Sequence, residues 1–154
     1  MSRNLRAQLV TLRPFLSESQ LGAILEGLAG EESAYFEGKI AEIASRIADM
    51  PATYQQDGKG DDAVAYLHYF IGGQDYWITE KDMDGDGTLQ AYGLASHGYG
   101  AEMGYISIAY LAGHHDEFDP ECLPDAENFP CVELDLEFEP QTLRDIKDSQ
   151  KLAA

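Results

Sequence analysis

Three alternating aspartates carry the clearest potential for chemistry in this sequence. Asp82, Asp84 and Asp86 are followed by Gly87, as in the opening of a calcium loop, where alternate carboxylates wrap one hard cation. The twelfth position of such a loop needs a bidentate glutamate, and here that position is Gly93. A β-turn rich in aspartate and glycine explains the same residues without a metal. The turn is therefore favoured, and weak cation binding by the three aspartates stays the alternative.

A second group of metal-ligand side chains lies further along the chain. Its members are two histidines, three carboxylates and both cysteines: His114, His115, Asp116, Asp119, Glu121, Cys122 and Cys131. Their spacing matches none of the paired patterns of structural zinc sites, which favours a solvated acidic loop. The cysteines are expected to be free thiols, and a disulfide between them stays open. The stretch from Gly113 to Pro130 is long for a connection in a compact domain, so a functional loop is predicted there.

Motifs of nucleophilic catalysis are missing from the sequence. There is no Gly-x-Ser-x-Gly elbow, no Walker loop and no dinucleotide fingerprint. Carboxylates are so abundant that naming any two as acid and base is uninformative. His68, alone within a predicted strand, is interpreted as a structural residue. We therefore expect a non-enzymatic protein with no catalytic residue and no cofactor.

Charge is distributed very unevenly along the 154 residues. Between Asp82 and Leu143 there is no lysine or arginine, whereas fourteen carboxylates fall in that window, and the net charge of the chain is −18. The segment from Val132 to Glu139 alternates apolar and acidic residues without a break. In a strand, alternate side chains point to opposite faces, so one face would carry carboxylates while the other entered the core. The predicted acidic row is Glu133, Asp135, Glu137 and Glu139.

This composition disfavours two classes of partner. Direct binding of DNA or RNA needs lysine and arginine to contact phosphates, and an anionic membrane surface needs them as well. The sequence has no apolar run long enough to cross a bilayer and no signal-peptide pattern, so a cytoplasmic protein is expected. Its hydrophobic fraction of 44% is that of an ordinary globular protein, and a single domain is predicted over residues 1–154.

Helices are predicted in the first third of the chain. Ser17 and Gln20 form a capping-box pattern, and the helix that begins there is expected to end at Gly30. A second helix is expected over about 31–49, because Pro51 forbids much continuation.

Strands are predicted for the rest of the chain, over 63–71, 74–81, 89–96, 103–111 and 132–139, before a short helix over 142–151. Short connections between the first four strands favour an antiparallel meander. The predicted fold is therefore α+β: an antiparallel sheet of about five strands packed against two N-terminal helices. The helical part covers about 1–55 and the sheet part about 60–145.

Aromatic residues are dense in the predicted sheet. They are Tyr66, Tyr69, Tyr76, Trp77, Tyr92, Tyr99, Tyr105 and Tyr110. Strand propensity and core packing explain most of them. An aromatic contact patch beside the acids stays open as an alternative.

Four segments of the predicted sheet region form a recognisable pattern: Tyr76–Asp82, Ala91–Leu94, Ala101–Ile108 and Glu133–Leu136 with Pro140. Together they resemble a domain-of-unknown-function family that is common on plasmids and integrative conjugative elements. The resemblance covers roughly residues 60 to 145 and describes a fold core with no established catalytic role. The long acidic stretch from Gly113 to Pro130, which follows the Ser-containing segment Ala101–Ile108, departs from that family. A function of this chain's own is expected there.

Carriage on a mobile element, as this resemblance implies, suggests an inhibitor of host defence. Such elements often encode small acidic proteins that imitate DNA. The leading hypothesis is an anti-CRISPR or anti-restriction protein that binds a basic nucleic-acid-binding protein or ribonucleoprotein. The expected partner-binding residues are the acidic row and a second acidic patch, Asp116, Glu117, Asp119 and Glu121. The alternatives are a divalent-cation-binding module and an accessory protein of plasmid transfer or maintenance.

Overall fold

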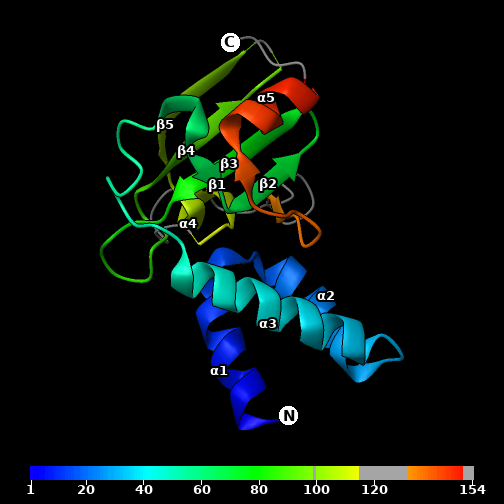
Figure 1. The fold of residues 1–154 in the computed structure, drawn as a ribbon. Coiled ribbons are helices and arrows are strands. Elements are labelled where there is room, and N and C mark those ends of the chain that lie inside the picture. The colour runs from blue at the N-terminus through cyan, green and yellow to red at the C-terminus, as the bar shows by residue number, and fades with distance from the viewer. Residues whose placement is uncertain (99, 115–131, 151–154) are drawn as a thin grey trace.

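The structure is a computed structural model that describes residues 1–98, 100–114 and 132–150. Helices come first in the chain and strands follow, as Figure 1 shows. The main sheet has five strands in the order β5-β4-β3-β2-β6, and each neighbouring pair is antiparallel. The predicted α+β fold with a five-stranded antiparallel sheet is confirmed.

Three helices form the N-terminal layer. They are α1 (Arg3–Leu12), α2 (Glu18–Ala29) and α3 (Ser33–Asp49), with a short 3-10 turn at Arg13–Phe15. Ser17 caps α2 as predicted, because its hydroxyl accepts a hydrogen bond of 3.0 Å from the backbone N–H of Gln20. The first helix, α1, was not predicted. Leu5 and Leu12 of this helix are buried in the core that it shares with the other helices.

The strands of the main sheet are β2 (Leu67–Ile71), β3 (Gln74–Glu80), β4 (Ala91–Ser96), β5 (Ala101–Ile106) and β6 (Glu133–Leu134). The predicted turn at Gly72-Gly73 joins β2 to β3, with Ile71 opposite Gln74. A second, two-stranded sheet pairs β1 (Val64–Ala65) with β7 (Gln141–Thr142). The predicted terminal helix is present as α5 (Leu143–Gln150).

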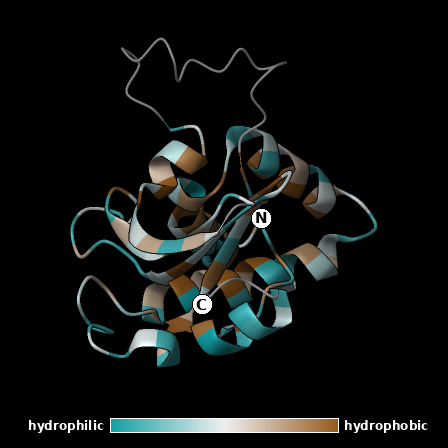
Figure 2. Cartoon of the chain, turned by 90° about the horizontal axis from the view of Figure 1, so that it is seen from above, coloured by the Kyte–Doolittle hydropathy of each residue, from teal (hydrophilic) through white to brown (hydrophobic). Residues whose placement is uncertain are grey.

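The main sheet lies between two layers. One face packs on the N-terminal helices, and the core there includes Ile40, Ile43, Leu67, Tyr69 and Ile78. The other face carries α5, which buries a second, smaller core: Ala63, Ala65, Trp77, Leu94, Phe138, Leu143 and Ile146. In Figure 2 the brown, apolar residues lie mainly toward the middle of the molecule, and teal, hydrophilic residues are frequent along the peripheral loops. None of the helices in the described ranges is long and apolar enough to cross a membrane.

The strand predicted over 103–111 is wrong in its second half. β5 ends at Ile106, and a short helix, α4 (Ile108–Leu111), follows. Ser107 caps this helix by accepting a hydrogen bond from the Tyr110 N–H, 3.1 Å away. Aromatic and β-branched composition therefore predicted a strand where a serine cap and tertiary contacts favoured a helical turn.

The long acidic strand predicted over 132–139 is also wrong. Only Glu133 and Leu134 pair with β2, and the chain then turns. Asp135 makes the turn, since its side-chain Oδ1 accepts from the Glu137 N–H at 3.0 Å. Alternating burial nevertheless persists, because Leu134 and Phe138 are buried while Glu137 is exposed. Local hydrogen bonding by the aspartate side chain replaced the strand that the binary pattern predicted.

Candidate partner-binding surface

The acidic segment, Val132–Glu139, borders a cavity of about 390 Å³ on the α5 side of the sheet. Three of the four predicted partner-binding carboxylates line it, namely Asp135, Glu137 and Glu139. The other walls come from β2, β3, the stretch before α5 and α5 itself: His68, Trp77, Phe138, Gln141, Ile146, Ser149 and Gln150. The cavity therefore has acidic and amide groups beside an aromatic surface, with no lysine or arginine among the described residues that line it.

His68 holds the acidic segment to the sheet. Its Nδ1 lies 2.9 Å from Oδ2 of Asp135, and its Nε2 lies 2.8 Å from Oδ1 of Asp75. The ring also stacks on Trp77, with centroids 5.2 Å apart and planes 10° apart. Ionised carboxylates only accept hydrogen bonds, so both bonds together require a proton on each ring nitrogen or on one carboxyl. The interpretation of His68 as structural agrees with this arrangement, in which both nitrogens are engaged.

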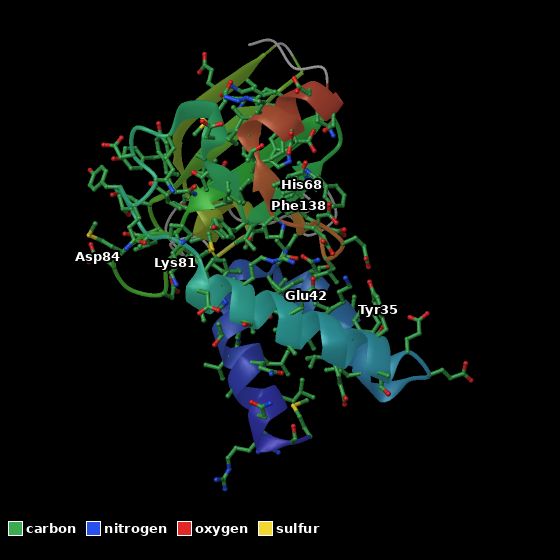
Figure 3. All side chains as sticks on the ribbon, viewed as in Figure 1. Tyr35, Glu42, His68, Lys81, Asp84 and Phe138 are labelled. Atoms are coloured by element: carbon green, nitrogen blue, oxygen red, sulfur yellow. The ribbon has the colours of Figure 1, made fainter. Side chains whose placement is uncertain are left out.

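Glu137 is held by two groups of α3. Its carboxylate accepts a hydrogen bond from the Tyr35 hydroxyl and forms an ion pair with Lys39, whose Nζ lies 3.2 Å from Oε2. These contacts lower the pKa of Glu137, chiefly through the Tyr35 hydrogen bond and then through Lys39. Figure 3 shows Tyr35 and Glu42 on the α3 layer, with His68 and Phe138 above them. Glu137 therefore joins the acidic segment to the N-terminal helices.

Glu137→Gln is expected to lower the melting temperature at pH 7 and to have a smaller effect at pH 3. A carboxylate whose pKa is lowered by folding stabilises the protein above its unfolded pKa, near 4.3, and this stabilisation is lost as the pH falls through the folded pKa. Thermal unfolding of both proteins at pH 7 and pH 3 measures the difference. Glu139→Gln is the control, since Glu139 is exposed and its loss should leave the melting temperature at pH 7 unchanged. If the melting temperatures of wild type and Glu137→Gln differed by the same amount at both pH values, the assigned contacts of Glu137 would be contradicted.

The four predicted carboxylates therefore divide into two pairs. Asp135 and Glu137 are bound by groups of their own chain. Glu133 and Glu139 are exposed, and neither forms an ion pair with any residue in the described ranges. The prediction of one uniform row of four carboxylates is wrong, because the turn at Asp135 breaks the strand.

The described carboxylates of the base-free window, the stretch from Asp82 to Leu143 without lysine or arginine, do not lie on one face. β5 and β6 are the two edge strands of the sheet, so Glu102 and Glu133 lie at opposite edges. Figure 3 places Asp84 and Lys81 on the opposite side of the molecule from His68 and Phe138. Carboxylates that belong to one window of the sequence therefore lie on different sides of the molecule, because the strand order separates β5 from β6.

Two of the three carboxylates in the Asp82–Gly87 turn accept hydrogen bonds from nearby backbone. Asp82 accepts from the N–H groups of Asp84 and Gln90, each at 3.0 Å, and Asp86 accepts from the N–H of Thr88 at 3.1 Å. Across the described ranges, no three acidic, histidine or cysteine side chains are grouped so that they could hold a metal ion. The favoured β-turn is present, and the structure does not bring Asp82, Asp84 and Asp86 together as cation ligands.

The second acidic patch, the two cysteines and His115 fall outside the described residues. Of the predicted loop cluster, only His114 is described. Its Nε2 donates a hydrogen bond to the carbonyl oxygen of Leu16 at 2.7 Å, which fastens the end of α4 to the N-terminal layer.

Sequence reasoning missed a further cavity, about 400 Å³ in volume, near the β5 edge of the same face. Its walls include the side chains of Tyr54, Glu80, Tyr92, Met103 and Tyr105. The density of tyrosines was a signal, but it did not reveal which rings converge. The convergence of the rings depends on the positive φ of Tyr54 and on a bulge between Ile78 and Glu80.

Comparisons of the chain with protein-family models, with curated proteins and with solved structures each found no match. The resemblance of residues 60 to 145 to the plasmid-borne family therefore stays a prediction.

Proposed function

We propose that this protein is a non-enzymatic inhibitor that binds a basic, nucleic-acid-binding surface of a host defence protein or ribonucleoprotein. It acts in the cytoplasm as a nucleic-acid mimic of the anti-CRISPR or anti-restriction type and is encoded by a mobile genetic element. The observation that carries the proposal is the acidic border of the α5-side cavity in a chain of net charge −18. A surface of this sign attracts a positively charged channel at long range.

Several of the chain's ten basic side chains make contacts within the protein. Lys39 and Arg46 bind Glu42, Arg144 binds Asp62, and Lys147 binds Asp61. Lys81 is directed to backbone, since its Nζ lies 2.7 Å from the carbonyl oxygen of Ile47. These five contacts offset part of the positive charge that would otherwise oppose a basic partner.

The partner contact is expected at Glu133 and Glu139, which are the exposed carboxylates of the acidic segment. Glu137 adds to the surface as well, because its side chain is 64% exposed despite its ion pair with Lys39. Asp135 has a supporting role through His68. An inhibitor built in this way would exclude DNA or RNA from the partner by occupying its phosphate-binding residues.

The test is an affinity capture from the native host, followed by binding measurements with charge-reversal variants. At low salt we expect recovery of a basic nucleic-acid-binding protein, with affinity that falls steeply as salt rises. Glu133→Lys with Glu139→Lys is expected to weaken binding about tenfold or more, and these exposed positions should preserve the fold. Reversal of Asp135 or Glu137 would be less informative, because both residues hold the structure together.

The matched control is Glu26→Lys with Glu37→Lys. These two exposed residues of α2 and α3 change the net charge by the same amount on the helical layer. Equal weakening by both double variants would mean that net charge alone matters and that the acidic segment is not the contact. Capture of only transfer-machinery proteins, with binding insensitive to salt, would replace the proposal with an accessory role in plasmid transfer or maintenance.

A further inference from the structure

The cavity near the β5 edge has a lining unlike that of the α5-side cavity. It measures about 400 Å³ and lies between the 53–63 segment, the ends of β3 and β4, and β5. Three tyrosine side chains and one methionine supply the apolar walls, and three carboxylates supply the charge: Tyr54, Tyr92, Tyr105, Met103, Asp57, Asp61 and Glu80. No lysine or arginine is among the described residues that line it.

The tyrosines form a connected cluster. Tyr92 and Tyr105 are opposite each other on β4 and β5, and their rings meet edge to face with centroids 5.5 Å apart. The hydroxyl oxygens of Tyr54 and Tyr105 lie 3.3 Å apart. Tyr54 is 63% exposed and Tyr105 is 59% exposed, so both rings offer large surfaces to a ligand. Isolated exposed aromatics need no explanation, but two exposed tyrosines and a half-buried third around one cavity are typical of a binding site.

Glu80 places a buried carboxylate in this aromatic cluster. Only 4% of the residue is exposed, and its two oxygens accept from the N–H groups of Tyr54 at 3.1 Å and Gln56 at 2.7 Å. No cation of the described residues lies within ion-pair distance of it. Buried carboxylates normally have a positive partner, and two hydrogen bonds leave acceptor capacity on both oxygens.

The same carboxylate shapes the cavity wall. Tyr54 adopts a backbone φ of 71°, which is unfavourable for a residue with a β-carbon. Its N–H donates to Glu80, and this bond holds the strained residue with its ring beside Tyr105. Of the other two acids, Asp61 is neutralised by Lys147 at 2.7 Å, whereas Asp57 is exposed. The net charge of the lining is therefore negative.

This lining selects the chemistry of the ligand. Negative groups exclude an anion, and tyrosine faces favour a cation that can stack on them. A guanidinium is planar, weakly hydrated and rich in donors for carboxylates, whereas an ammonium is a compact, strongly hydrated charge. The geometry points to an arginine side chain as the occupant, presented by a basic partner protein. The inference rests on the proposed function only for the source of that arginine. The preference of the cavity itself can be measured with a free probe.

The probe is N-acetyl-arginine methylamide, titrated into isotopically labelled protein and followed by backbone amide NMR. We expect saturable shifts at Gln56, Glu80, Tyr92 and Tyr105. N-acetyl-citrulline methylamide has the same shape without the charge, and it should bind about tenfold more weakly. Equal binding of both compounds, or shifts spread evenly over the acidic surface without saturation, would overturn the proposal.

Tyr105→Leu tests the aromatic contribution. Leucine keeps apolar contact on the exposed edge strand, so the fold should survive while arginine affinity falls about fivefold. Tyr110→Leu is the control, since Tyr110 is similarly exposed at 58% and does not line the cavity. Equal affinities of the two variants would contradict the assigned role of Tyr105. If the free arginine probe binds this cavity but affinity capture recovers no basic partner, the cavity assignment stands while the proposed function fails.

Discussion

Gly93→Ala is expected to destabilise the protein by roughly 3 kcal/mol, close to the upper limit for overpacking. A β-carbon built at Gly93 would lie 2.0 Å from the carbonyl oxygen of Trp77 and 3.0 Å from Cα of Ile78. Both atoms belong to the backbone of β3, where the register shifts between Ile78 and Glu80. The neighbouring strand cannot move away without breaking the ladder. Urea unfolding of wild type and variant measures the loss.

Gly104→Ala is the matched control for this prediction. Gly104 is the direct cross-strand partner of Gly93 on β5, and a β-carbon there meets no atom within 4 Å. The substitution should be neutral or stabilising by up to about 1 kcal/mol, because alanine has less conformational freedom in the unfolded chain. If both variants lost the same stability, the close approach of β4 to the bulge of β3 would be refuted.

His68→Leu is expected to lower the free energy of unfolding by about 2 kcal/mol. Leucine retains apolar contact with Trp77 but leaves the carboxylates of Asp75 and Asp135 without their shared partner. Those side chains are 31% and 29% exposed, so water screens part of the penalty, which keeps the expected loss moderate. Chemical denaturation at pH 7 provides the measurement.

A double variant separates the charge effect from lost packing. Adding Asp135→Asn to His68→Leu removes one unpaired carboxylate, and asparagine still offers Oδ1 to the Glu137 N–H. The double variant should therefore be more stable than His68→Leu alone. Equal stabilities would mean that the carboxylates are not what makes the histidine necessary, and that stacking on Trp77 carries its contribution.

Local signals predicted the elements whose boundaries depend on local interactions. Ser17, Gln20 and Gly30 marked both ends of α2, and Gly72-Gly73 marked the hairpin, because capping and turn conformation involve residues only a few positions apart. The same reasoning failed for Val132–Glu139. There the binary pattern competed with an aspartate turn, and the turn prevailed beyond the two residues that β2 could pair.

The candidate sites were predictable only in part. The acidity of the Val132–Glu139 segment follows directly from its composition. Its apolar residues are also more buried than most of its acidic ones, as the alternation of the two types predicts. The partners of Asp135 and Glu137 are His68, Tyr35 and Lys39, which lie far away along the chain. No spacing rule connects such residues, so the internal use of these two carboxylates was invisible in the sequence.

By itself the sequence determined the α+β class, the caps and hairpin turn, and the strong negative charge, since each depends on composition or on neighbours along the chain. The tertiary structure alone decided which carboxylates stay exposed, how strand order divides the base-free window between two edges, and which tyrosines surround Glu80. The physical reason is that these outcomes depend on long-range pairing and on backbone approach. The sheet register, the bulge between Ile78 and Glu80 and the positive φ of Tyr54 bring distant residues together.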